Sequence, residues 1–299
     1  MSRILVSGLV NVETTVQVRQ FPVPYYPIDY PFFGVRSAVS GVGFNIAKAL
    51  ATLGDEVTLT SLTGSDFAGS YIRKELEGAG VSAAHVRSVL RETPASAVLY
   101  DGEGRRQIYC DLKDIQDATY DFPDDVCQSA DFVVACNINF SRRLLHLAKA
   151  AGKPIATDVH VLRDIDDGYN REFMQHAHVL FLSDEGVGED YRPFLTELAR
   201  VYPAQILVIG RGGKGAAMYL RSEGRIFDLP AANAGPVVNT VGAGDALFSA
   251  FIHDYARGLH PLAALRRAQL FAARKIGVSG ASKGFCSQAE LDALDARQG

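Results

Sequence analysis

Short apolar runs and amphipathic stretches alternate along the chain, and this pattern predicts its secondary structure. Buried strands are predicted at residues 4–6, 57–59, 132–134, 154–156, 179–182 and 206–209, and amphipathic helices at 141–151 and 191–200. From about residue 130 the strands and helices alternate regularly. Such alternation indicates an α/β fold with a mostly parallel sheet that is covered by helices on both faces.

One glycine-rich stretch runs directly into an apolar helical pattern. It reads Asn239-Thr240-Val241-Gly242-Ala243-Gly244-Asp245, and the helical pattern after it ends at Gly258. The unpaired N–H groups at a helix start attract an anion, and glycines there let a ligand approach the backbone closely. Asp245 beside such a site is suited to take a proton from a hydroxyl that attacks a phosphoryl group. The alternative is that Asp245 only caps the helix and the glycines only form a turn.

Two other polar clusters also lie beside predicted elements. Asn11 and Glu13 follow the first strand, where open α/β sheets bind ligands, although Glu13 is equally compatible with a solvated loop. The run from Ser40 to Asn45 contains Gly41 and Gly43 and opens a helix. Its glycines would let a sugar lie against the backbone, and Asn45 offers a donor and an acceptor for hydroxyls. A tight turn before a helix is the simpler explanation of the same run.

Residues 21–36 differ in composition from the rest of the chain. Six aromatic residues and four prolines fall between Phe21 and Phe33. Prolines at this density exclude a helix and favour edge strands or extended loops. The aromatic side chains are suited to pack against a lid or a second copy, to stack on a nucleobase, or to cover the core.

Composition narrows the class of protein. The 299 residues are 47% hydrophobic and 21% charged, as in ordinary globular proteins, and a net charge of −4 argues against nucleic acid as a partner. The four cysteines are scattered without metal-binding spacing, and no stretch resembles a signal peptide or a membrane span. We therefore expect a soluble cytoplasmic protein with reduced thiols and no zinc.

The glycine-rich runs together resemble the signatures of a known family. Residues 238–251, VNTVGAGDALFSAF, resemble the C-terminal signature of the PfkB, or ribokinase-like, family of carbohydrate and nucleoside kinases. Residues 40–47 resemble its N-terminal signature, with Ser40 in place of a glycine. The resemblance implies a three-layer α/β/α sandwich with a small β lid. It implies one kinase domain over residues 1–299, in which residues 11–38 and 94–115 form the lid.

The resemblance also implies a reaction and a set of site residues. The γ-phosphoryl group of ATP would move to a primary hydroxyl of a sugar, or alternatively of a nucleoside, with Asp245 as general base. The backbone around Gly242, Ala243 and Gly244 would stabilise the moving charge. The acceptor would be held by the lid and by Asn11, Glu13, Gly41, Gly43 and Asn45. Small strands of this kind also often form a homodimer contact in the family.

A second glycine run, 210–215, matches the dinucleotide fingerprint G-x-G-x-x-G. Because a β-hairpin rather than a helix is predicted after it, the nicotinamide-binding interpretation fails. In the family this region lines the ATP site. The resemblance therefore assigns ATP binding to Asp184, Arg211, Gly212, Gly215, Thr240 and Gly244, with magnesium bridging the phosphates.

Two positions depart from the family pattern. Val187 stands where the family has a Glu that organises magnesium, so either Glu185 or Glu189 would take its place or metal binding would rely more on the nucleotide phosphates. Asn239 stands where ribokinases have an Asp that helps to bind a monovalent cation, and its neutral side chain argues against potassium activation. Because the metal position is altered, the alternative to a kinase is a non-catalytic protein that binds a sugar or a nucleotide.

Overall fold

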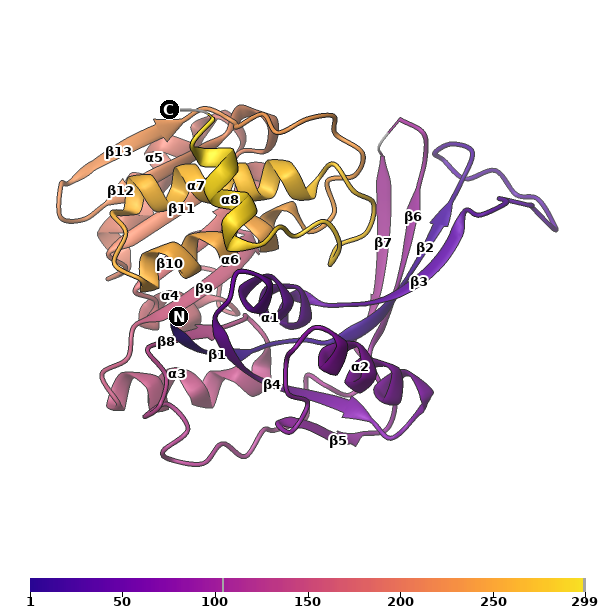
Figure 1. The fold of residues 1–299 in the computed structure, drawn as a ribbon, viewed down its shortest axis with the longest axis horizontal. Coiled ribbons are helices and arrows are strands. Elements are labelled where there is room, and N and C mark those ends of the chain that lie inside the picture. Colours follow the sequence, from indigo (N-terminus) through magenta and orange to yellow (C-terminus); the bar gives the residue numbers. More distant parts are fainter. Residues whose placement is uncertain (104, 298–299) are drawn as a thin grey trace.

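The computed structural model describes residues 1–103 and 105–297, and its elements alternate along most of the chain (Figure 1). The first part comprises β1 (Arg3–Ser7), β2 (Asn11–Gln17), β3 (Val35–Ser40), α1 (Val42–Thr52), β4 (Glu56–Gly64), α2 (Phe67–Gly78), β5 (Val86–Leu90), β6 (Ala95–Tyr100) and β7 (Arg106–Asp111). The second part comprises β8 (Phe132–Ala135), α3 (Arg142–Ala150), β9 (Ile155–Val161), α4 (Arg171–His176), β10 (Val179–Ser183), α5 (Tyr191–Val201), β11 (Ile206–Gly210), β12 (Ala216–Leu220), β13 (Arg225–Leu229), α6 (Ala243–Ala256), α7 (Pro261–Lys275) and α8 (Gln288–Asp295).

The large sheet has nine strands in the order β13-β12-β11-β10-β9-β8-β1-β4-β5. All neighbours from β5 to β11 pair in parallel, whereas β12 and β13 form an antiparallel hairpin at the edge. Because the carboxyl ends of parallel strands meet at one edge of a sheet, the loops after β1, β8, β9, β10 and β11 lie at the same edge. This edge carries the candidate site.

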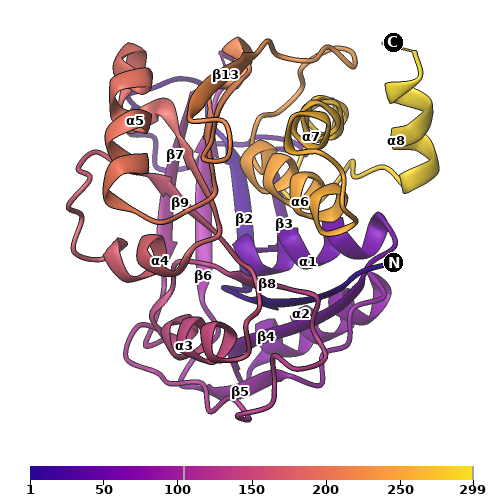
Figure 2. The ribbon, with the colours of Figure 1, turned by 90° about the vertical axis from the view of Figure 1, so that its left-hand side faces the viewer.

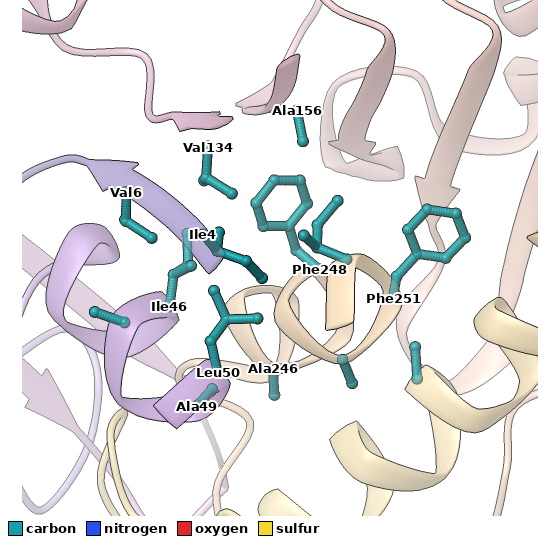
Figure 3. Close-up of a cluster of buried hydrophobic side chains, with 14 of the residues drawn as sticks. Ile4, Val6, Ile46, Ala49, Leu50, Val134, Ala156, Ala246, Phe248 and Phe251 are labelled. Carbon is teal, nitrogen blue, oxygen red and sulfur yellow. The ribbon is translucent and has the colours of Figure 1, made fainter. Parts of the chain in front are cut away.

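Helices cover both faces of the large sheet because its strands are apolar on both sides. Figure 2 shows α3, α4 and α5 on one face and α1, α6, α7 and α8 on the other. Along β1, Ile4 and Val6 belong to the core on the α1 and α6 side, whereas Leu5 packs in the core beside α3. The close-up in Figure 3 shows α1 and α6 lying together under the sheet, with Leu50 and Phe248 in the same cluster. This packing fixes the two helices relative to each other.

The smaller sheet has four strands in the order β3-β2-β6-β7 and stands beside the large one (Figure 1). β2 pairs in parallel with β6 and antiparallel with β3, and β6 pairs antiparallel with β7. Between β2 and β3 lies an irregular stretch that we call the aromatic arm, residues 21–33. It extends away from the large sheet, and Tyr25 and Phe33 are 88% and 91% exposed.

The predicted α/β/α sandwich with a mostly parallel sheet is confirmed, as is the hairpin after residue 215. Residues 101–105 connect β6 to β7, and Gly104 lies outside the described residues. The sequence analysis missed β5, α4, α7 and α8. Within residues 1–103 and 105–297, no helix is long and apolar enough to cross a membrane.

Candidate active site

The loop before α6, residues 239–245, forms the centre of the site, and we call it the phosphoryl loop. Gly242 precedes the helix in a left-handed conformation with φ of 78°, and a Cβ there would lie 2.4 Å from the carbonyl oxygen of Ala281. Glycine is therefore required at this position for both reasons. A Cβ on Gly244, by contrast, would meet no protein atom within 4 Å, which leaves open space in front of the helix start.

The backbone of the phosphoryl loop leaves donors free for a ligand. The Ala243 N–H donates to the carbonyl of Thr240 at 3.1 Å, so it is already used within the turn. No protein acceptor among the described residues takes the N–H of Gly244 or of Asp245. Free N–H groups at the positive end of a 14-residue helix suit an anion. The predicted anion hole thus has its free donors at Gly244 and Asp245, one position later than Ala243.

Asp245 lies in the first turn of α6 and is partly buried. Asn45 of α1 donates from Nδ2 to Asp245 Oδ2 at 2.7 Å, so two residues that are 200 positions apart meet through the packing of α1 on α6. Burial raises the pKa of the Asp245 carboxyl, and the nearby His160 and the Asn45 hydrogen bond oppose that shift. A carboxylate with a raised pKa is a better proton acceptor than an ordinary surface Asp.

Asn11 and Glu13 lie on β2, on the acceptor side of the phosphoryl loop. Asn11 donates from Nδ2 to Ser96 Oγ at 3.1 Å, and Ser40 Oγ donates to Glu13 Oε2 at 3.4 Å. Burial raises the pKa of Glu13, and the charge of Asp245 raises it further. The structure therefore brings Glu13 and Asp245 into one electrostatic environment, which the solvated-loop alternative for Glu13 does not account for.

Two buried amide oxygens, on β2 and α1, have no hydrogen-bond donor among the described residues. Oδ1 of Asn11 and Oδ1 of Asn45 are buried without a partner in the described chain, and the two residues are 4% and 3% exposed. A buried carbonyl oxygen without a donor is costly, so each is expected to have a partner when a ligand is bound. Both oxygens are acceptors, and a ligand that satisfies them must carry donors such as hydroxyl groups.

Close packing against the protein backbone explains why Gly41 and Gly43 of the 40–45 run are glycines. Gly41 has φ of 96°, and a Cβ on it would lie 2.6 Å from the carbonyl oxygen of Leu9. A Cβ on Gly43 would lie 2.6 Å from the carbonyl carbon of Gly8, which holds α1 against the end of β1. The structure thus explains both glycines by contacts with the protein backbone. Asn45 is the residue of this run whose side chain enters the site.

Lys275, at the end of α7, belongs to the site and was missed by the sequence analysis. Its side chain is fully buried, and Nζ donates to the carbonyl oxygen of Val241 in the phosphoryl loop. Burial lowers the pKa of Lys275 to about 8, against the opposing effect of the Asp245 and Glu13 carboxylates. The sequence pattern indicated no role for Lys275, because no helix was predicted over residues 261–275.

Four of the residues assigned to ATP lie in the loops that follow the neighbouring strands β10 and β11, and they are Asp184, Arg211, Gly212 and Gly215. Asp184 follows β10 and Arg211 follows β11. The Arg211 guanidinium lies 3.7 Å from the centre of the Tyr191 ring and 3.5 Å from Glu189, and its Nε is buried without a partner. Thr240 is exposed. This part of the site is more open than the acceptor side.

The two glycines assigned to ATP differ from each other. Gly215 has φ of 96°, and a Cβ there would lie 2.0 Å from the carbonyl oxygen of Leu229, so this glycine is fixed by the hairpin behind it. Gly212 has φ of 53° and open space around its hypothetical Cβ. A close approach of a ligand is therefore compatible with Gly212, whereas Gly215 already has a structural explanation.

The carboxylates present fit magnesium that arrives with a nucleotide. No group of three or more metal-ligating side chains gathers anywhere in residues 1–103 and 105–297. Magnesium in nucleotide sites typically uses one or two carboxylates together with phosphate oxygens and water, so such a group is not needed. Glu185 is 65% exposed at its side chain, and one of its oxygens lies 3.9 Å from Nη2 of Arg106. Val187 offers no ligand, as expected from its side chain.

Comparisons with known proteins found one matching family model and several similar proteins. The family model for pfkB family carbohydrate kinases matches residues 1–287. The fructosamine kinase FrlD of Bacillus subtilis (strain 168) is 26% identical over 264 residues, which cover 87% of this chain and 89% of that protein. The microbiome-derived acarbose kinase Mak1 has a similar structure, with a TM-score of 0.88, 24% identity and 99% of both chains covered. The nucleoside kinase of Methanocaldococcus jannaschii, an archaeal member of the ribokinase family, has a TM-score of 0.82 at 18% identity, again with 99% of both chains covered.

Proposed function

Because this chain belongs to the pfkB family of carbohydrate kinases, whose members phosphorylate a sugar or nucleoside with ATP, we propose that its acceptor is a sugar and that Asp245 is the general base. The observation that carries the proposal is the pairing of Asp245 with a free helix start. The side-chain Nδ2 of Asn45 donates to the Asp245 carboxylate at 2.7 Å. The backbone N–H groups of Gly244 and Asp245, which have no acceptor among the described residues, belong to the same helix start. A base and an anion site adjacent to each other are what phosphoryl transfer to a hydroxyl needs.

The proposed reaction is an in-line displacement. The O–H bond of the acceptor breaks as its proton passes to a carboxylate oxygen of Asp245, and the acceptor oxygen bonds to the γ-phosphorus of ATP. The bond from that phosphorus to the β–γ bridging oxygen breaks, and ADP leaves. The free N–H groups of the phosphoryl loop offset the charge that develops on the transferred group. Magnesium, held by the phosphates with help from Asp184 or Glu185, would supply further charge neutralisation.

The unpaired oxygens on Asn11 and Asn45 favour a sugar over a nucleoside. A sugar presents several hydroxyl donors close together, which is the complement that two buried amide oxygens require. The aromatic arm, the feature that would stack on a base, extends away from the large sheet (Figure 1), and its Tyr25 and Phe33 are exposed. FrlD and Mak1 are both named for kinases of sugar-derived acceptors, which agrees with this choice.

The deciding experiment is an ATP-consumption assay with magnesium on a panel of sugars and nucleosides. The Asp245→Asn variant is run beside the wild type. Turnover on sugars that the variant loses would support both parts of the proposal. Turnover on nucleosides alone would overturn the sugar assignment, and full activity of the variant would overturn the base assignment. Binding of a sugar without any turnover would favour the non-catalytic alternative and direct attention to Val187.

We also propose that residues 11–38 and 94–115 act as a lid within one kinase domain and that the aromatic arm forms a homodimer contact. Several large apolar side chains of the arm are exposed, which supports a partner for them. A second copy would bury them, and Phe33→Ser would then shift the mass measured by light scattering towards the monomer. Use of ATP and four free cysteines are consistent with a cytoplasmic protein.

A further inference from the structure

Lys275 places a full positive charge beneath the phosphoryl loop. It is 0% exposed, and its ammonium group donates to the carbonyl oxygen of Val241. The carboxylates that face it are Asp245 on α6 and Glu13 on β2. Removing an ammonium group from water is costly unless charges and hydrogen bonds compensate it. A structural lysine is rarely buried so completely, so its position beside the anion site calls for a functional explanation.

The same loop does not fit a bound potassium ion. The Asn239 side chain carries no charge, and its Oδ1 accepts the Val241 N–H at 2.8 Å, so this oxygen is engaged in a local turn. The Val241 carbonyl, another oxygen of the loop, is taken by Lys275. An ammonium group within the loop also repels a second cation. The residues present therefore disagree with a monovalent-cation site at this place.

We propose that Lys275 is an internal cation that replaces a monovalent metal ion: it holds the phosphoryl loop in its anion-binding conformation and makes phosphoryl transfer independent of potassium. Lys275 acts as a positioning residue, through the Val241 carbonyl and through its charge. The inference rests on the proposed role of the phosphoryl loop. The inference goes beyond that role because it identifies a side chain of α7 as the cation that stabilises the loop.

The first test compares potassium chloride with tetramethylammonium chloride at equal ionic strength, using the wild-type enzyme and the sugar found active above. Equal turnover in the two salts is the expected result. Activation by potassium would overturn the proposal. Loss of turnover in Asp245→Asn checks the proposed function separately, so a failure of one inference is distinguishable from a failure of the other.

The second test removes the ammonium and returns it as a small molecule. In Lys275→Ala we expect kcat to fall by about 100-fold, a loss comparable to that of an anion-hole donor. Ammonium or ethylammonium ions should restore part of the lost kcat, whereas tetramethylammonium, which cannot donate a hydrogen bond, should not. Lys48→Ala is the matched control. Lys48 is half-buried over the Phe44 ring, and burial lowers its pKa too, but the charges that act on it are those of Glu75 and Lys283.

The pH profile separates a positioning role from a merely structural one. Wild-type turnover should fall as the pH rises through about 8, where Lys275 loses its charge, and this limb should be absent in Lys275→Ala. Asp158 and His160 face Asp245, and Arg106 faces Glu13, so Asp158→Asn and Arg106→Gln should retain the limb. Unchanged kcat in Lys275→Ala, or a loss that no small ammonium ion restores, would overturn the proposal. If Lys275→Ala does not fold by circular dichroism, the wild-type salt comparison decides alone.

Discussion

The acceptor half and the nucleotide half of the site are built in different ways. On the acceptor side, Asn45 and Lys275 are buried, and each makes a hydrogen bond within the site. On the nucleotide side, Thr240 and Glu185 are exposed, and Arg211 is held by an aromatic ring and one long ion pair. The protein thus fixes Asp245 and the N–H groups at the start of α6 before a ligand binds, and it leaves much of the proposed nucleotide contact to be completed by the ligand.

The difference teaches where transition-state stabilisation resides. Groups that are held rigidly before the substrate arrives need no reorganisation during the reaction, and they act most strongly where water is excluded. Exposed side chains in a groove mainly set how tightly the substrate binds. We therefore expect changes on the acceptor side to lower kcat and changes on the nucleotide side to raise KM for ATP.

The largest effect is expected at Asp245. Replacing it with Asn removes the proton acceptor but keeps the shape, so kcat should fall by about 1,000-fold while KM for ATP changes little. Steady-state kinetics with varied ATP measures both. If the variant instead lost affinity for ATP and kept its kcat, Asp245 would belong to the nucleotide side, and the proposed division of the site into two halves would be wrong.

Asn45→Ala should lower kcat/KM for the acceptor by roughly 30-fold, because it removes one hydrogen bond to Asp245 and one oxygen for the acceptor. The Asn45 hydrogen bond lowers the pKa of Asp245, so its loss should raise that pKa further. Asp245 acts as a base only when ionised, and activity is lost as the pH falls through its pKa. The acid limb of the pH–rate profile should therefore move to higher pH in the variant. An unmoved limb would mean that another group controls it.

Gly215→Ala should destabilise the fold by about 2 kcal/mol, because the new Cβ meets the Leu229 carbonyl at a backbone conformation that favours glycine. Gly213→Ala is the control, since a Cβ at Gly213 meets nothing within 4 Å and its φ is not in the left-handed region. Thermal unfolding followed by circular dichroism compares the two. If the two variants had equal melting temperatures, the structural explanation of Gly215 would be wrong, and ligand binding would be left as the reason for a glycine there.

The smallest effect is expected at Arg211. Its replacement by Ala should raise KM for ATP by less than about tenfold and leave kcat near the wild-type value, because its guanidinium contacts the Tyr191 ring and the exposed Glu189 carboxylate rather than the phosphoryl loop. Arg200→Ala serves as the control, since Arg200 forms only an exposed pair with Glu197. A large fall in kcat for Arg211→Ala would show that the nucleotide side is as preorganised as the acceptor side.

Local pattern was enough to predict the parallel strands β1, β4 and β8 to β11, the helices α3 and α5, and the helix start at Asp245, because the signal for each element lies within about twenty consecutive residues. Pattern could not reveal Lys275, whose role depends on how α7 packs against a loop 34 residues earlier in the chain. Nor could it show that Gly43 contacts Gly8 through the backbone. Such contacts are set by tertiary packing, and one sequence carries no direct record of them.

The smaller sheet enters the fold as two separate insertions. The chain leaves the large sheet after β1 and returns before α1, and it leaves again after β5 to form β6 and β7. The phosphoryl loop belongs to neither insertion. Laboratory evolution can therefore exchange residues 18–34, or the connection between β6 and β7, without changing the segment that carries Asp245. The phosphoryl loop and the smaller sheet are therefore encoded by different stretches of the gene.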